Sequence, residues 1–113
     1  MHLLVLVLNR EEFLDEVLEA FVEAGVTGAT IVDSVGMGRT LAYRIPLFAG
    51  LKRSIKTSDY NKMIFSVVQS DEILTEVMKL LDEIIDFDVS GSGLLFVVPI
   101  TLIKGMRLEE LSW

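Results

Sequence analysis

The chain of 113 residues contains no cysteine and a single histidine, His2, beside the first methionine. Without cysteine there is neither a disulfide framework nor a thiolate metal site. One histidine alone is a poor basis for a transition-metal site or for acid–base catalysis. No serine lies in a nucleophile-elbow pattern, and most carboxylates are spaced as exposed charges of helices. We therefore expect neither enzymatic activity nor a metal site.

Long apolar runs are also missing. The run Leu3–Leu8 is of strand length, whereas a membrane-spanning helix needs about 20 apolar residues. No basic segment precedes it, so a signal peptide is not expected. The net charge of −7 argues against a general nucleic-acid binder. We expect one cytoplasmic domain over residues 1–113, with no nucleic-acid partner and no membrane insertion.

The pattern of apolar residues predicts four strands and two helices. The strands are expected at Leu3–Leu8, Gly28–Val35, Met63–Val68 and Leu94–Ile100, which are aliphatic runs bounded by turn residues. One helix should follow Asn9 and end at Gly25, and the other should follow Ser70, with Asn9 and Ser70 as N-caps. Pro99 lacks an N–H group, so it should lie at a sheet edge or near its strand's end.

This order of elements predicts an α+β fold of the ferredoxin-like class. Two split β-α-β units (βαββαβ) form one antiparallel sheet and place both helices on one face. All four strands are apolar on both sides, so the face without helices should be buried against other copies of the chain. We therefore expect an oligomer, for which a closed ring is the natural form.

The segment from residue 39 to residue 62 differs in charge from the rest. It holds six of the ten Lys and Arg residues and one acid, Asp59. We expect a long loop here, and long connections of this kind are typical of functional segments. Its apolar residues either rest on the protein itself or dock on a partner, and both interpretations remain open; contact with a membrane surface is less favoured. The residues expected to contact a partner are Arg44, Leu47, Phe48, Leu51, Lys52 and Arg53.

Two glycine pairs flank predicted strands. Gly36-Met-Gly38-Arg39 follows the second strand, and Gly91-Ser92-Gly93 precedes the fourth. Backbone N–H groups in such turns can bind an anion, and Arg39 adds positive charge. Each pair taken alone is also explained as a tight turn that uses positive φ angles.

The run Gly28–Arg39, the long connection after it and the run Gly91–Pro99 resemble the P-II nitrogen-regulator family in motif, element order and length. The resemblance implies a non-enzymatic signalling protein that forms a homotrimer, with its sheets facing the threefold axis. Members of that family bind an adenine nucleotide between adjacent subunits. Their long loop reports the ligand state to ammonium transporters, enzymes of nitrogen metabolism or transcription regulators.

The resemblance also implies roles for individual residues, with ATP, ADP or AMP as the candidate effector. Gly28 and Thr30 would face the adenine, Gly36, Gly38 and Arg39 the phosphate side, Gly91, Ser92 and Gly93 the phosphates, and Arg107 would match one of two family arginines. Leu94 stands where the family usually has a lysine. Segment 39–62 would be the regulatory loop and segment 101–113 a C-terminal tail.

Two other functions remain open. The chain could be a trimeric scaffold that captures a partner through the apolar part of its loop and binds no nucleotide. It also resembles the CutA-type ferredoxin-like trimers linked to divalent metals, although one histidine and no cysteine disfavour that alternative.

Overall fold

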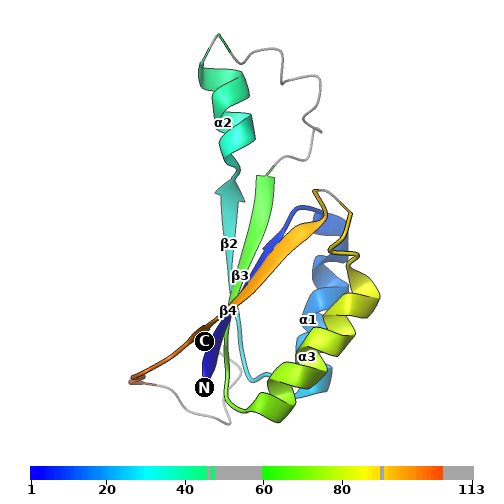
Figure 1. Cartoon of the computed structure of the whole chain (residues 1–113), viewed down its shortest axis with the longest axis vertical. Helices are drawn as coiled ribbons and strands as arrows, with labels where there is room; N and C mark the ends of the chain where they lie inside the picture. Colours follow the sequence, from blue (N-terminus) through cyan, green and yellow to red (C-terminus); the bar gives the residue numbers. More distant parts are fainter. Residues whose placement is uncertain (46, 48–59, 90, 106–113) are drawn as a thin grey trace.

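The computed structural model describes residues 1–45, 47, 60–89 and 91–105 (Figure 1). In chain order its elements are β1 (His2–Leu8), the 3-10 turn η1 (Glu11–Phe13), α1 (Leu14–Ala24), β2 (Thr30–Val35), α2 (Met37–Arg44), β3 (Tyr60–Val68), α3 (Asp71–Ile84) and β4 (Gly93–Pro99). Figure 1 shows α1 and α3 side by side, while α2 stands beyond the end of β2, away from both.

The four strands form one antiparallel sheet in the order β2-β3-β1-β4. This is the arrangement that two split β-α-β units produce, so the predicted ferredoxin-like class is confirmed. The aliphatic run of β1 occupies the centre of the sheet, between β3 and β4. Pro99 ends the edge strand β4, where its missing N–H group costs no ladder hydrogen bond, as predicted.

The core lies between one face of the sheet and the helices α1 and α3. Alternate residues of β1 and β3 point to this face, because successive side chains of a strand alternate between its two sides. The main buried residues are Leu4, Leu6 and Leu8 of β1, Ile64 and Val68 of β3, Val17 and Phe21 of α1, and Val77 and Leu81 of α3. We call this side of the sheet the helix face.

Two of the predicted helix ends are confirmed and one is wrong. Gly25 ends α1 with a left-handed φ of 96°, and the Ser70 hydroxyl accepts a 3.2 Å hydrogen bond from the Ile73 N–H at the start of α3. Asn9 does not cap a helix, because η1 comes between it and α1. Its side-chain amide instead donates a 3.0 Å hydrogen bond to the carbonyl of Gly91.

The helix α2 corrects the expectation that the chain becomes a loop at the first glycine pair. Gly36 is the N-cap residue, and its carbonyl accepts hydrogen bonds from both the N–H and the hydroxyl of Thr40. The pair Gly36–Gly38 resembles a break in sequence because glycine disfavours helix interiors, yet here it forms the helix start. The β3 strand also begins at Tyr60, three residues before the predicted Met63.

The opposite side of the sheet, which we call the open face, is also apolar. From the strand register it comprises Leu3, Val5, Val7, Val32, Met63, Phe65, Val67, Leu94, Phe96 and Val98. Leu94 is 59% exposed and Phe96 43% exposed, and α1 and α3 both lie on the helix face. A contiguous apolar surface of this kind usually marks an interaction site.

Candidate functional site

The two glycine pairs lie at the same end of the sheet but on its opposite edges. The register aligns Asp33 of β2 with Lys62, then Leu8, then Gly93 of β4. With strands about 4.8 Å apart, this row measures roughly 14 Å from edge to edge. A single chain therefore does not bring Gly36 and the Gly91 turn together, whereas neighbouring chains placed edge to edge would do so.

The turn at Gly91–Gly93 has a fixed backbone. Gly91 has a φ of 80°, which disfavours any residue with a side chain. A Cβ atom on Gly93 would lie 3.0 Å from the Val7 carbonyl oxygen, so a side chain is not tolerated there without a backbone shift. The Ser92 N–H donates to the Val89 carbonyl at 3.2 Å, and Ser92 is buried. The backbone of the turn itself therefore favours glycine at both positions, whether or not a ligand binds.

The pair Gly36 and Gly38 has different geometry. Neither residue has a positive φ, and a Cβ atom on Gly38 would meet no atom within 4 Å. A tight turn therefore does not explain glycine at position 38. The guanidinium carbon of Arg39 lies 4.7 Å from the centre of the Tyr43 ring, one turn further along α2, within the range of a cation–π contact.

Gly28 and Thr30 lie towards the other end of β2. The Gly28 carbonyl accepts a 2.8 Å hydrogen bond from the Ser66 hydroxyl, and Thr30 lies in register with Phe65 on the open face. At about 3.3 Å per residue, Gly28 and Gly36 are separated by roughly 25 Å along the strand. The structure thus spreads the predicted nucleotide-binding residues along one edge strand and at the start of the other.

Lys62 was placed at the end of the expected loop 39–62, whereas in the structure it is the third residue of β3. Its ammonium group pairs with the carboxylate of Asp33 on β2 and lies 3.4 Å from a carboxylate oxygen of Glu11 in η1. The hydrogen bond with Asp33 is the main cause that raises the pKa of Lys62, and the contact with Glu11 adds to it, while burial acts the other way. Lys62 therefore belongs to the fold, and no sequence pattern indicated its two partners.

The expected partner-contacting residues are described only in part. Arg44 ends α2 and is exposed, and Leu47 is 85% exposed. Phe48, Leu51, Lys52 and Arg53 lie outside the described residues, as does Arg107 among the expected nucleotide-binding residues.

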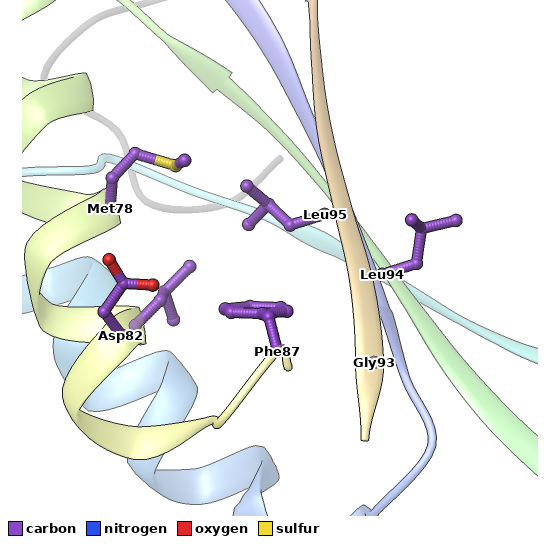
Figure 2. A pocket seen from close by; sticks show the side chains of 7 residues that line it. Met78, Asp82, Phe87, Gly93, Leu94 and Leu95 are labelled. Carbon is purple, nitrogen blue, oxygen red and sulfur yellow. The ribbon is translucent and has the colours of Figure 1, made fainter. Parts of the chain in front are cut away.

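A cavity of about 290 Å³ lies between α3 and β4, next to the Gly91–Gly93 turn (Figure 2). It is lined by Met78, Leu81, Asp82, Phe87, Gly93, Leu94 and Leu95. Figure 2 shows Leu95 directed from β4 towards α3 and Leu94 directed to the other side of the strand. Asp82 supplies the charge of this lining, so the cavity suits an apolar group and not a phosphate.

The described residues contain no group of three His, Cys, Asp or Glu side chains placed to hold a metal ion. His2 lies in β1 with its Nδ1 atom 3.9 Å from a carboxylate oxygen of Asp71. Within the same parts of the chain, no helix is both long and apolar enough to cross a membrane.

Known proteins match this chain over most of its length. A family model described as Nitrogen regulatory protein P-II matches residues 1–110. A protein named Nitrogen regulatory protein P-II from Azospirillum brasilense is 27% identical over 97 residues, which cover 86% of this chain and 84% of that relative.

Proposed function

Because this chain belongs to the P-II family of nitrogen regulatory proteins, we propose that it is a regulator that binds a small anionic effector between subunits. The effector is an adenine nucleotide, and the readout is the segment 39–62, which includes most of α2. The family membership supports a signalling role, and the geometry of the two glycine pairs supports the position of the effector.

The proposed assembly is a homotrimer that buries the open face. The ten apolar residues of that face have no cover from α1 or α3, which lie on the helix face. Burial of apolar surface contributes about 25 cal/mol per Å², and this contribution favours association of copies that cover the open face. Three sheets facing a common axis cover one another's open faces.

The observation that carries the proposed site is the position of the glycine pairs on opposite edges at one end of the sheet. In a ring of chains, the β2 edge of one subunit lies beside the β4 edge of the next. This arrangement places Gly36, Gly38 and Arg39 of one subunit near the Gly91–Gly93 turn of its neighbour. Backbone N–H groups then approach the phosphates from one side and the Arg39 guanidinium from the other.

Gly38 gives independent support, because neither its φ nor its surroundings require a glycine. Absence of a side chain at the first turn of α2 leaves the backbone open to close approach by a ligand. Gly28 and Thr30, further along β2, are the proposed contacts of the adenine ring. Arg107, which lies outside the described residues, is the remaining proposed contact of the phosphates.

The proposed target is a membrane transporter or a metabolic enzyme in the cytoplasm. The α2 helix stands clear of the two core helices in Figure 1. Its exposed end carries Arg44, and exposed Leu47 follows shortly after. A protruding element with mixed basic and apolar groups is suited to docking on another protein.

Leu94 favours a second candidate, a trimeric scaffold without a nucleotide. This residue is exposed on the open face and stands where the family usually has a lysine, so one phosphate-binding charge is missing. The scaffold would capture its target equally well with and without nucleotide.

Calorimetric titration of ATP and ADP into the purified protein tests the proposal. We expect saturable binding that Arg39→Ala weakens by roughly tenfold, the loss expected for one charge-assisted hydrogen bond. The matched control is Arg44→Ala in the same helix, which should leave the affinity unchanged. Absence of binding by the intact trimer would overturn the nucleotide site and favour the scaffold.

A further inference from the structure

The short stretch Asn9–Glu11, which runs from the end of β1 to the first residue of η1, contacts two distant parts of the molecule. We call these three residues the connector. Asn9 contacts the Gly91 turn beside β4, and Glu11 contacts Lys62 on β3. The two contacts lie on opposite sides of β1, which is the strand between β3 and β4.

The Asn9 contact fixes one peptide unit of the Gly91 turn. The carbonyl of Gly91 accepts the hydrogen bond of the Asn9 side-chain amide at 3.0 Å. The N–H of the same peptide unit, that of Ser92, donates to the Val89 carbonyl at 3.2 Å. With both of its polar groups bonded, this peptide plane has a defined orientation, and its reorientation breaks these hydrogen bonds unless Asn9 or Val89 moves with it.

Glu11 contacts Lys62 at the end of the antiparallel pair β2–β3 that lies next to α2. We call this end of the two strands the base of β2–β3. Lys62 is paired in register with Asp33 of β2. Its side chain is only 20% exposed, although Lys62 is the third residue of β3. Its ammonium group lies between the Asp33 and Glu11 carboxylates. Three residues after Asp33, Gly36 begins α2. The contacts of Lys62 therefore connect the base of β2–β3 to η1.

We propose that the connector couples the Gly91 turn to the base of β2–β3 within one subunit, with Asn9 and Glu11 as positioning residues. A change in the turn moves Asn9, and because Glu11 is only two residues away it alters the Glu11–Lys62 contact. The role of this coupling in signalling rests on the proposed function, in which the turn holds the effector and α2 reports it. The coupling itself is a property of the ligand-free chain.

Amide hydrogen exchange of the ligand-free protein, followed by mass spectrometry, tests the coupling. Glu11→Gln removes the negative charge that contacts Lys62 and keeps the shape of the Glu11 side chain. We expect exchange to become roughly fivefold faster at Tyr60–Lys62 and also at Gly91–Gly93, which Glu11 does not contact. Asn9→Ala should accelerate exchange in the same two segments, although Asn9 contacts only the Gly91 turn.

The matched control is Glu16→Gln. Glu16 is an exposed glutamate in the first turn of α1 and lies outside the connector. Its replacement should leave both segments unchanged. The proposal is overturned if Glu11→Gln accelerates exchange only at β3 and Asn9→Ala accelerates it only at the turn.

ATP added to the same experiment separates this proposal from the proposed function. In the unmodified protein, ATP should slow exchange at the Gly91 turn and at Tyr60–Lys62. In the double variant Asn9→Ala with Glu11→Gln, protection at Tyr60–Lys62 should become smaller, because only the contact of ATP with the adjacent Gly36 end of β2 remains. Equal protection of Tyr60–Lys62 in the unmodified protein and in the double variant contradicts the coupling. If ATP protects neither segment, the effector site of the proposed function fails, while the ligand-free comparison still decides the coupling.

Discussion

The two faces of the sheet are similar in composition and different in what covers them. The helix face presents Leu4, Leu6 and Leu8 of β1, all fully buried beneath α1 and α3. The open face presents Phe96 and Val98 of the edge strand, both more than 40% exposed. Strands that are apolar on both sides are typical of sheets covered on both sides. The comparison indicates that this chain encodes one cover for its sheet, and we propose that further copies of the chain supply the other.

A charge placed on the open face should have the largest effect. Phe96→Glu puts a carboxylate where the proposed assembly excludes water, so we expect the trimer to dissociate into monomers. Sedimentation velocity measures the change directly. The matched control is Val22→Glu on α1, where the native side chain is 66% exposed on the outer surface. A trimer that survives Phe96→Glu would show that the open face is not the interface.

A cavity on the helix face should have the next largest effect. Leu6 is fully buried, and Leu6→Ala should lower the free energy of unfolding by about 3 kcal/mol, from lost apolar burial and the cavity that remains. Chemical denaturation measures the change. Val22→Ala, at an exposed position, should stay within about 0.5 kcal/mol of the unmodified protein. A small loss for Leu6→Ala would mean that the helix face is less well packed than its burial indicates.

Removal of the N-cap of α3, one of the two helices that cover the helix face, should have a smaller effect on stability. Ser70→Ala deletes the hydroxyl that accepts the Ile73 N–H and should lower the free energy of unfolding by about 1 kcal/mol. Thermal unfolding at fixed protein concentration measures it. Ser70→Asp keeps a capping oxygen, so it should retain most of the stability, and an equal loss in both variants would exclude the cap as the cause.

The smallest effect concerns Lys62, at the end of the helix face. Its pKa is raised chiefly by the hydrogen bond with Asp33, so its contribution to folding is complete below the unfolded pKa of about 10.4 and is lost as pH rises through the higher folded value. The difference in unfolding free energy between the unmodified protein and Lys62→Gln should be constant between neutral pH and about pH 10 and shrink above it. Denaturation at several pH values tests this, and a difference that already shrinks near neutral pH would contradict the assignment.

Much of the fold follows from local patterns in the sequence. The continuous aliphatic run of β1 is typical of a strand covered on both faces, and β1 lies at the centre of the sheet. Gly25 and Ser70 predicted helix ends because a cap depends on residues within one turn. The prediction that Asn9 caps a helix was wrong because it also used only nearby residues. The hydrogen-bond partner of Asn9 is Gly91, 82 residues away in sequence. Helix α2 was missed because glycine at Gly36 and Gly38 has low helix propensity.

The candidate site was predictable in part. The glycine pairs and their residues were identified from sequence, and the register shows that they lie at one end of the sheet on opposite edges. The connector could not be predicted, because the contacts of Asn9 and Glu11 join segments that only the folded sheet brings together. Lys62 was grouped with the expected loop because of its charge, whereas in the structure it lies in β3 and pairs with Asp33 and Glu11.

The mass of the unmodified protein in solution tests the central claim most directly. Sedimentation equilibrium at micromolar concentration measures it without any variant or ligand. We predict a single species of three times the chain mass of 12.6 kDa, with the open face buried between subunits. A stable monomer of one chain mass would contradict the account, because it would leave the apolar open face in water and the two glycine pairs on separate edges.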